Sequence, residues 1–391
     1  MSASGEAPPP EDFRDTIEQR VTPLELFFDL VFVFAITQVT GFLSDDLTWA
    51  GVARGMALLA ALWWAWVGYS WLTNAVPAEE AIPARLVILS AMAAMLVASL
   101  AVPGAFGEDG VLFGLVYFAV RLLHVALYAL ATRNEPEVSR AVVRLAPGFL
   151  GGPALLIVAG FLDGPAQGVL WVLALAIDYG APLARGVLGF RGHARHFVER
   201  HGLIVIIALG ESIVAVGVGA SGLKLGAGVV IAALLGMVVA AGLWWTYFDL
   251  VALAAERRLT RARGSERAAL ARDSYSYLHL PMVAGIVLVA LGVKKVLADF
   301  GDPLGTIPAI ALCGGVALYL LGHNAFRLRD VGSVSVERLI AAAASLALVP
   351  LALQAPALVA LTSVAVLLAA LVVLEAARYR ELRRKLRSTA Q

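Results

Sequence analysis

Long apolar runs recur along the whole chain, separated by short stretches that contain glycine, proline and charged residues. A helical run of about 20 apolar residues, at roughly 1.5 Å per residue, is long enough to cross the hydrocarbon of a membrane. The pattern therefore predicts an all-α, polytopic bundle of about 12 transmembrane helices. Their expected positions are 23–43, 48–72, 82–102, 111–132, 142–162, 166–186, 201–221, 226–251, 274–298, 304–326, 336–353 and 356–377.

Basic residues gather in alternate connections between these runs. One side of the membrane receives Arg133 and Arg140, the arginines from 185 to 200, those from 257 to 272, Arg327 and Arg329, and the tail from Arg378 to Arg387. The opposite side receives little beyond Arg54, Lys224, Lys294 and Lys295. By the positive-inside rule, both termini are expected in the cytoplasm, which agrees with an even number of spans.

Composition supports an integral membrane protein, with 60% hydrophobic residues, 15% charged residues and a mean hydropathy of +0.83. The first 20 residues lack the apolar core of a secretory signal, so the first span is expected to stay in the mature protein. A single cysteine, Cys313, excludes an internal disulfide and a multi-cysteine metal site. No cofactor or metal is predicted, and a net charge of +1 gives no reason to expect a nucleic-acid partner.

The two halves of the chain resemble each other weakly at an offset near 180 residues. The segment 58–72 and the segment 237–251 both carry a Trp-Trp pair followed by aromatic residues. Because six spans is an even number, such halves would be parallel repeats related by an axis along the membrane normal. We therefore expect a disordered cytoplasmic tail at 1–20, a first repeat at 21–190, a second repeat at 191–378 with a basic cytoplasmic loop at 254–272, and a basic cytoplasmic tail at 379–391.

Two carboxylates enter the first span, in "VTPLELFFDLVFVFAIT". Glu25 and Asp29 are four residues apart and project from one helix face, with Asp29 roughly 10 Å below the cytoplasmic surface. An ionised carboxylate at that depth must be paired, protonated or in contact with water. Both residues are candidate ion-binding or substrate-binding groups.

The fourth span, "VYFAVRLLHVALY", places Arg121 and His124 on one face near the middle of the membrane. Arginine keeps its proton, so Arg121 requires an acidic partner inside the bundle, and Asp29, Asp178 and Glu211 are the candidates. The interpretations left open are an ion pair that orients helices and a direct role in a substrate or ion path.

The seventh span, "ERHGLIVIIALGESIVAVGVGA", carries Glu211 and Ser212 deep in an apolar run. Glu211 is either a protonated carboxyl bonded to a facing helix or a group that binds protons or cations. His323 is a further candidate, since histidine titrates near neutral pH. If Asp29, Arg121 and Glu211 are functional, we expect them to line one wet cavity between the halves.

Aromatic and large apolar residues form a second set of candidates. Phe28, Phe32 and Ile36 on the first span are expected to line a path or a hydrophobic gate. Trp64 and Trp245, from the two Trp-Trp pairs, are candidates to line the interior, although simple core packing is the favoured interpretation.

Two segments closely resemble the signature sequences of the bacterial low temperature requirement A (LtrA) family. They are "RVTPLELFFDLVFVFAITQ", from Arg20 to Gln38, and "ERHGLIVIIALGESIVAVG", from Glu199 to Gly217. The resemblance covers essentially the whole chain and implies a multi-pass protein of the bacterial inner membrane. It implies no mechanism, because the family name describes a growth phenotype in the cold.

A looser similarity links the first span to a family of endolysosomal and bacterial potassium channels, whose first helix carries Phe-Ser-Asp before an apolar pore lining. Here Phe28 replaces the serine, and the second half has Gly210, Glu211 and Ser212 in place of the triplet. Because of these departures, we favour transport over channel function.

The sequence is compatible with three main functions, and a scaffold or sensor role is also left open. We favour a secondary transporter in which Asp29 and Glu211 carry protons or cations and Arg121 is the countercharge. A cation channel gated by dewetting and an intramembrane lipid-modifying enzyme are the alternatives. The expected partners are membrane lipids and a small solute or ion, and a homo-oligomer is left open.

Overall fold

The computed structural model describes residues 21–76, 81–187, 193–221, 224–249 and 251–380. Within these ranges the chain is helical and forms no β-strand. The predicted tails at 1–20 and, from residue 381 onward, at 379–391 lie outside the described residues. The helices are α1 (Pro23–Asp45), α2 (Trp49–Ala75), α3 (Ile82–Leu100), α4 (Gly110–Ala131), α5 (Pro136–Ala159), α6 (Gly164–Arg185), α7 (Ala194–Ala220), α8 (Ala227–Phe248), α9 (Val251–Arg261), α10 (Gly264–Leu270), α11 (His279–Ala298), α12 (Thr306–Val331), α13 (Val336–Ala347), α14 (Val349–Ala352) and α15 (Ala357–Arg378), with a π-helical turn η2 (Ala271–Tyr277) before α11.

Eleven helices in the described part are long and apolar enough to cross a membrane. The predicted run at 336–353 differs from the others, because it forms the 12-residue helix α13 and the four-residue helix α14. Pro350 has no backbone N–H to donate to Leu346, and the helix is interrupted at Leu348. A polytopic membrane architecture is thus confirmed, and its eleventh predicted span is a shorter, broken helix.

The basic segment at 254–272, expected as a connection between spans, is helical in the structure. Helix α9 continues past the apolar part of α8 to Arg261, and α10 begins at Gly264 and runs through η2 into α11. Only residues 262 and 263 interrupt the helices within that range. The charged residues there lie on amphipathic helical extensions, which hydropathy alone does not distinguish from a polar loop.

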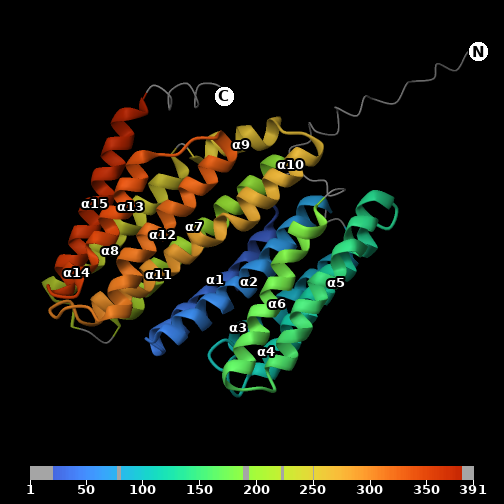
Figure 1. Cartoon of the computed structure of the whole chain (residues 1–391), viewed down its shortest axis with the longest axis horizontal. Helices are drawn as coiled ribbons and strands as arrows, with labels where there is room; N and C mark the ends of the chain where they lie inside the picture. The colour runs from blue at the N-terminus through green and yellow to red at the C-terminus, as the bar shows by residue number, and fades with distance from the viewer. Residues whose placement is uncertain (1–20, 77–80, 188–192, 222–223, 250, 381–391) are drawn as a thin grey trace, which may run out of the picture.

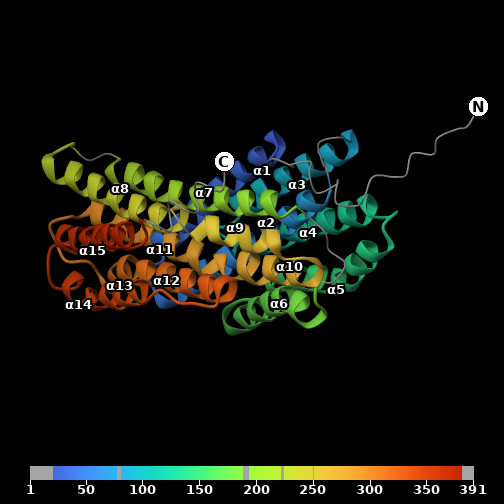
Figure 2. The same cartoon turned by 90° about the horizontal axis from the view of Figure 1, so that it is seen from above.

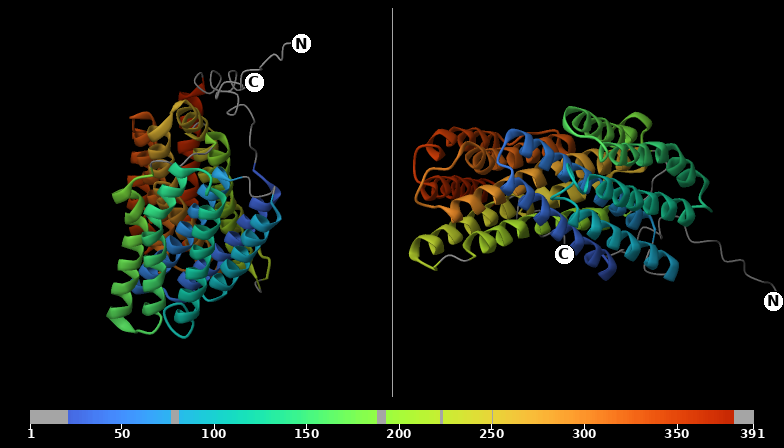
Figure 3. Two further views of the ribbon diagram at one scale, coloured as in Figure 1. Left: turned by 90° about the vertical axis from the view of Figure 1, so that its right-hand side faces the viewer. Right: turned by 90° about the horizontal axis from the view of Figure 1, so that it is seen from below.

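The helices form two groups joined by a central layer. Helices α3 to α6 lie on one side of Figure 1, and α8 and α12 to α15 lie on the other. The central layer consists of α1, α2, α7 and α11. Within it, α1 and α2 contact α7 and α11. The same separation along the long axis is visible from above in Figure 2 and from below in Figure 3, where most helix axes run side by side.

Helix α1 begins at a capping box that explains part of its sequence. The backbone N–H of Thr22 donates to Oε2 of Glu25 at 2.9 Å, the backbone N–H of Glu25 faces the Thr22 hydroxyl at 3.4 Å, and Pro23 occupies the first turn. Glu25 therefore has a structural role at a helix start as well as its place inside the bundle.

Several arginines outside the apolar runs pair at one end of the bundle, called here the basic end. Arg329 pairs with Asp273, Arg195 pairs with Glu256, and Arg185 donates to the carbonyl of Arg144. These contacts bring together the ends of α6 and α12 and the starts of α5, α7 and η2. The charge pattern thus identified residues that share one end of the structure.

Candidate functional site

The first helices of the two halves, α1 and α7, lie side by side and are joined by three polar contacts. Nε2 of His196 lies 3.0 Å from Oε2 of Glu25, Nη2 of Arg200 lies 3.0 Å from Oδ1 of Asp29, and the hydroxyl of Thr37 lies 2.6 Å from Oε2 of Glu211. The residue numbers rise together on both helices, so α1 and α7 run in the same direction. These six residues are called the α1–α7 seam.

The hydrogen bonds around His196 determine where its protons lie. The amide oxygen of Asn74 accepts the backbone N–H of His193 at 3.0 Å and faces Nδ1 of His196 at 3.1 Å. Because that oxygen only accepts, Nδ1 of His196 must carry a hydrogen. Nε2 of His196 faces Oε2 of Glu25, which accepts the N–H of Thr22. Two acceptor atoms in contact would repel each other, so a second proton lies between Nε2 and Glu25.

Arg200 supplies the permanent positive charge of the seam. Its guanidinium is fully buried, lies beside Asp29, and places Nε 4.0 Å from Oε1 of Glu25. It also lies over the indole of Trp66 at 5.6 Å, and that indole donates to Oδ1 of Asp29 at 2.8 Å. Arg200 was counted among the basic residues of the cytoplasmic side, and the structure shows it as a buried residue of α7.

A small cavity adjoins this end of the seam. Its volume is about 10 Å³, and it is lined by Glu25, Phe28 and Arg200 together with residues of α2 and α3. Phe28 also packs against Phe32 and Tyr69, with ring centroids 5.5 and 4.8 Å apart. Phe28, Phe32 and Ile36 are all buried, and Phe32 and Ile36 lie along α1 between Asp29 and Thr37, the partner of Glu211.

Glu211 lies farther along the seam and faces a hydroxyl instead of a cation. The single hydroxyl hydrogen of Thr37 has two acceptors, since the same oxygen lies 3.0 Å from the carbonyl of Val33. A protonated Glu211 satisfies both contacts, because it donates to Thr37 while Thr37 donates to Val33. Its neighbour Ser212 is buried, and its hydroxyl has no hydrogen-bond partner among the described residues.

Arg121 pairs with an acid of its own half. Its Nη2 lies 2.8 Å from Oδ1 of Asp178 on α6, and its Nη1 donates to the carbonyl of Trp64 at 3.3 Å. A buried acidic partner for Arg121 was predicted, and Asp178 was one of three candidates. A Cβ at Gly68 would lie 2.7 Å from Nη1 of Arg121 and 3.1 Å from Cε1 of His124, so a larger residue on α2 would displace this guanidinium.

Asp29, Arg121 and Glu211 therefore do not converge. They contact Arg200, Asp178 and Thr37 respectively, and α2 lies between the first two, with Trp66 facing Asp29 and the Trp64 carbonyl facing Arg121. The structure divides the single chamber expected from the sequence into three separate polar contacts. Spacing along each helix could not reveal this, because it does not fix which helices become neighbours.

Arg338 is a further buried arginine that the sequence pattern did not reveal. Nε and Nη2 of Arg338 on α13 lie 2.7 and 2.9 Å from the two carboxylate oxygens of Glu375 on α15. Nη2 donates to the carbonyl of Thr246 at 2.9 Å, and Nη1 lies 3.1 Å from Nδ1 of His323. The candidate His323 thus belongs to a polar contact of the second half.

Trp64 and Trp245 differ in environment although both belong to Trp-Trp pairs. Trp64 is buried and stacks on Tyr179 with ring centroids 4.1 Å apart. Trp245 is 38% exposed on α8. The lining role expected for Trp245 is therefore wrong, because its side chain faces outward.

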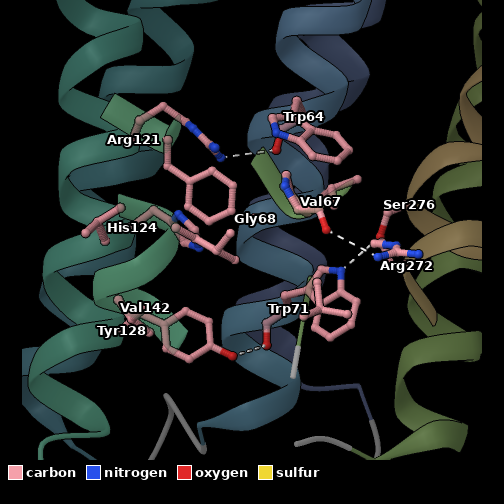
Figure 4. A pocket seen from close by; sticks show the side chains of 15 residues that line it. Trp64, Val67, Gly68, Trp71, Arg121, His124, Tyr128, Val142, Arg272 and Ser276 are labelled. Atoms are coloured by element: carbon pink, nitrogen blue, oxygen red, sulfur yellow. Dashed lines mark hydrogen bonds between the residues drawn. The ribbon is translucent and has the colours of Figure 1, made fainter. Parts of the chain in front are cut away.

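A pocket lies between α2, α4, α5, α6 and η2. Its volume is about 50 Å³, and its walls are mostly aromatic and aliphatic. Figure 4 shows Arg121, His124 and Tyr128 on one wall, Trp64, Gly68 and Trp71 on a second, and Arg272 and Ser276 on a third. Of the candidate acids, none lines it.

Comparison with known proteins identifies the family. The sequence matches the bacterial low temperature requirement A protein (LtrA) family over residues 20–373. The chain belongs to the LtrA family. A family relative in Rhizobium meliloti (strain 1021), named "Uncharacterized protein RA0937", is 32% identical over 311 residues, which cover 76% of this chain and 75% of that protein. No solved structure matches the chain.

The LtrA resemblance found in the sequence is thus confirmed. The two signature segments contain five of the six seam residues, namely Glu25, Asp29, Thr37, Arg200 and Glu211, and His196 lies just before the second segment. His196 and Arg200 repeat the spacing of Glu25 and Asp29 with the opposite charge. That match between two helix starts is the signal by which the sequence could have revealed the seam.

Proposed function

We propose that the chain is a proton-coupled secondary transporter of the bacterial inner membrane, with the α1–α7 seam as its coupling element. The observation that carries the proposal is the 3.0 Å contact between Nε2 of His196 on α7 and Oε2 of Glu25 on α1, where we infer a shared proton. If α1 and α7 move apart during transport, a proton bound between them is released as they separate.

Charge balance makes that proton consequential. Glu25 and Asp29 together contribute two negative charges, Arg200 contributes one positive charge, and the shared proton supplies the second. Loss of the proton would leave one uncompensated negative charge in a buried interface, which is strongly unfavourable. Proton release is therefore expected to favour a state in which the seam opens to water.

Glu211 provides a second proton-binding group on the same seam. It lies 15 residues after His196 on α7, or about 22 Å along the helix at 1.5 Å per residue. The buried side chains of Phe32 and Ile36 lie along α1 between the two levels. Acids at two depths, separated by apolar packing, suit alternating exposure of binding groups to the two sides of a membrane.

The proposal includes two parallel six-helix halves. It is supported by the parallel run of α1 and α7 and by a shared pattern within the halves. Tyr117 donates to the carbonyl of Ala61 on α2 at 2.9 Å, and Tyr319 donates to that of Leu243 on α8 at 2.7 Å. In each half a buried arginine, paired with an acid, also donates to a carbonyl on the helix that carries the Trp-Trp pair.

Under this proposal the basic end faces the cytoplasm and both termini lie there. The chain acts as a carrier, without catalysis, on a small solute or ion within the lipid bilayer. The test uses purified protein in proteoliposomes with a trapped pH dye, under a potential clamped with potassium and valinomycin. Sodium, amino acids, sugars and monocarboxylates are added singly.

Saturable pH change that depends on one added solute supports a carrier. A steep ohmic potassium or sodium current, measured in planar bilayers, would instead establish a channel and overturn the proposal. Failure of every solute class to move protons, with protein that is folded and correctly inserted, would also overturn it.

A further inference from the structure

A cavity larger than the pocket of Figure 4 lies between α9, α12, α13 and α15. Its volume is about 110 Å³, and one wall consists of apolar side chains of α9 together with Phe326 of α12. Four charged residues also line it, namely Arg327 and Asp330 on α12, Arg338 on α13 and Glu375 on α15. What the cavity can bind depends on which of these charges already have partners.

Arg338 and Glu375 satisfy each other. The guanidinium of Arg338 contacts both carboxylate oxygens of Glu375, at 2.7 and 2.9 Å, and its remaining contacts are with His323 and the carbonyl of Thr246. The pair is neutral and fully used within the protein. The charges left in the cavity are those of Arg327 and Asp330.

Asp330 is a buried carboxylate without a countercharge of its own. Only 5% of its surface is exposed, and neither oxygen accepts a hydrogen bond in the described part of the chain. The hydroxyl of Ser274 on η2 lies nearby and has one hydrogen for the two oxygens. Arg329 and Arg258, whose charges also act on Asp330, are paired with other acids at 3.0 and 2.5 Å. Such a carboxylate is unfavourable unless a cationic group or a proton satisfies it.

Arg327 is a positive group on the same helix. Its Nε donates to the hydroxyl of Ser333 at 3.2 Å, and its central carbon lies 6.0 Å from the ring centroid of Tyr379. Its terminal Nη groups have no hydrogen-bond partner among the described residues. Arg327 and Asp330 are three residues apart, a spacing at which helical side chains can meet, yet neither Asp330 oxygen accepts from Arg327. Both charges therefore remain available to a ligand.

We propose that this cavity binds a small zwitterion of the size of glycine or alanine, with its ammonium group at Asp330 and its carboxylate at Arg327. Each unpaired charge is the counter-ion of one end of such a molecule, and charge-assisted hydrogen bonds to both ends orient it. This inference concerns binding alone and does not rest on the proposed transport function.

The volume of the cavity limits the size of the ligand. A cavity of about 150 Å³ in an engineered protein holds one benzene molecule, so about 110 Å³ admits a ligand of about five or six non-hydrogen atoms. Glycine and alanine meet this limit, whereas the side chain of leucine exceeds it. Size and charge together therefore define the expected ligand.

The test is equilibrium dialysis of the full chain in dodecyl maltoside against radiolabelled glycine. We expect saturable binding of glycine, competition by alanine and no competition by leucine. N-acetylglycine lacks the ammonium group and glycinamide lacks the carboxylate, so each is expected to compete at least about tenfold more weakly than glycine, equivalent to about 1.4 kcal/mol. Absence of saturable binding to folded protein would overturn the proposal. Methylammonium or acetate that competes as well as glycine would show a site for a single charge and contradict a zwitterion.

Two substitutions on α12 test the charges. Asp330→Asn is expected to weaken glycine binding by at least about tenfold without lowering the midpoint of thermal unfolding, because the carboxylate lacks a countercharge in the unliganded protein. Arg327→Gln is expected to weaken glycine binding to the level of glycinamide while leaving glycinamide unchanged. Arg329→Gln is the control, because Arg329 does not line the cavity and is expected to leave the preference for glycine over glycinamide intact. A preference that survives Arg327→Gln would overturn the proposed orientation.

Two alanines of α9 form a matched pair for the location. Ala254 lines the cavity and Ala252 does not, although both are half-buried. Ala254→Leu is expected to fill part of the space and weaken glycine binding by at least about tenfold, whereas Ala252→Leu is expected to leave it unchanged. Equal glycine affinity of the two variants would overturn the proposed location, and the Arg327→Gln comparison remains informative if Ala254→Leu fails to fold.

Discussion

Nη2 of Arg200 on α7 lies 3.0 Å from Oδ1 of Asp29 on α1, and both side chains are buried. Removing one partner of a buried pair typically destabilises a protein by about 3–5 kcal/mol, because an uncompensated charge stays inside. Arg200→Gln is therefore expected to lower thermal stability strongly in detergent.

The double variant Asp29→Asn with Arg200→Gln is expected to recover part of that loss, giving a coupling free energy of at least about 1 kcal/mol. Thermal unfolding followed by tryptophan fluorescence measures all four forms. Strictly additive effects would show that the two groups do not interact.

The pair of Arg338 and Glu375 provides a second test of buried charge. Glu375→Gln leaves the Arg338 guanidinium without its two carboxylate contacts of 2.7 and 2.9 Å and is expected to destabilise by about 3 kcal/mol. Glu266→Gln is the control, because the pair of Glu266 with Arg258 is exposed and is expected to contribute less than about 1 kcal/mol. Unfolding curves of equal midpoint would contradict the assignment.

Adjacent glycines on α12 allow a sharp test of packing against α11. A Cβ at Gly315 would lie 2.8 Å from the carbonyl oxygen of Gly285, whereas a Cβ at Gly314 would meet its nearest atom at 3.6 Å. Gly315→Ala must push the two backbones apart and is expected to cost about 1–3 kcal/mol. Gly314→Ala is expected to leave the free energy of unfolding unchanged or raise it slightly. Thermal unfolding of the two variants compares them.

Glu211 is expected to be protonated in the resting protein, because Thr37 has only one hydrogen for two acceptors. Infrared spectroscopy at neutral pH should therefore contain a carboxylic acid C=O stretch that is absent from Glu211→Gln. The amide of glutamine keeps a donor toward Thr37, so this variant should unfold within a few tenths of a kcal/mol of the unmodified protein. An unchanged carboxylic acid band would contradict the assignment.

Hydropathy predicted the architecture well, because crossing a membrane requires long apolar helices wherever the chain passes. It placed eleven membrane-length helices and failed at the segment containing Pro350, where apolar composition continues but the helix does not. The need for an acid beside Arg121 followed from the same physics, and Asp178 meets it.

The candidate site was less predictable, because partners are chosen by tertiary packing. Counting basic residues placed Arg200 on the cytoplasmic side but could not show that its guanidinium is buried beside Asp29, since a charged residue at a helix start resembles one in a loop. The Trp-Trp pairs were treated alike, yet Trp64 faces inward and Trp245 outward, because a nearly uniform apolar helix gives little indication of its buried face.

The most direct measurement of the proton-coupled seam compares gradient-driven flux in proteoliposomes for the unmodified protein, Glu25→Gln and Glu266→Gln. With a solute found to move protons, Glu25→Gln should lose at least about tenfold of the flux driven by a pH gradient, equivalent to about 1.4 kcal/mol, while Glu266→Gln should retain it. Unchanged pH-driven flux in folded Glu25→Gln protein would contradict a coupling proton between Glu25 and His196.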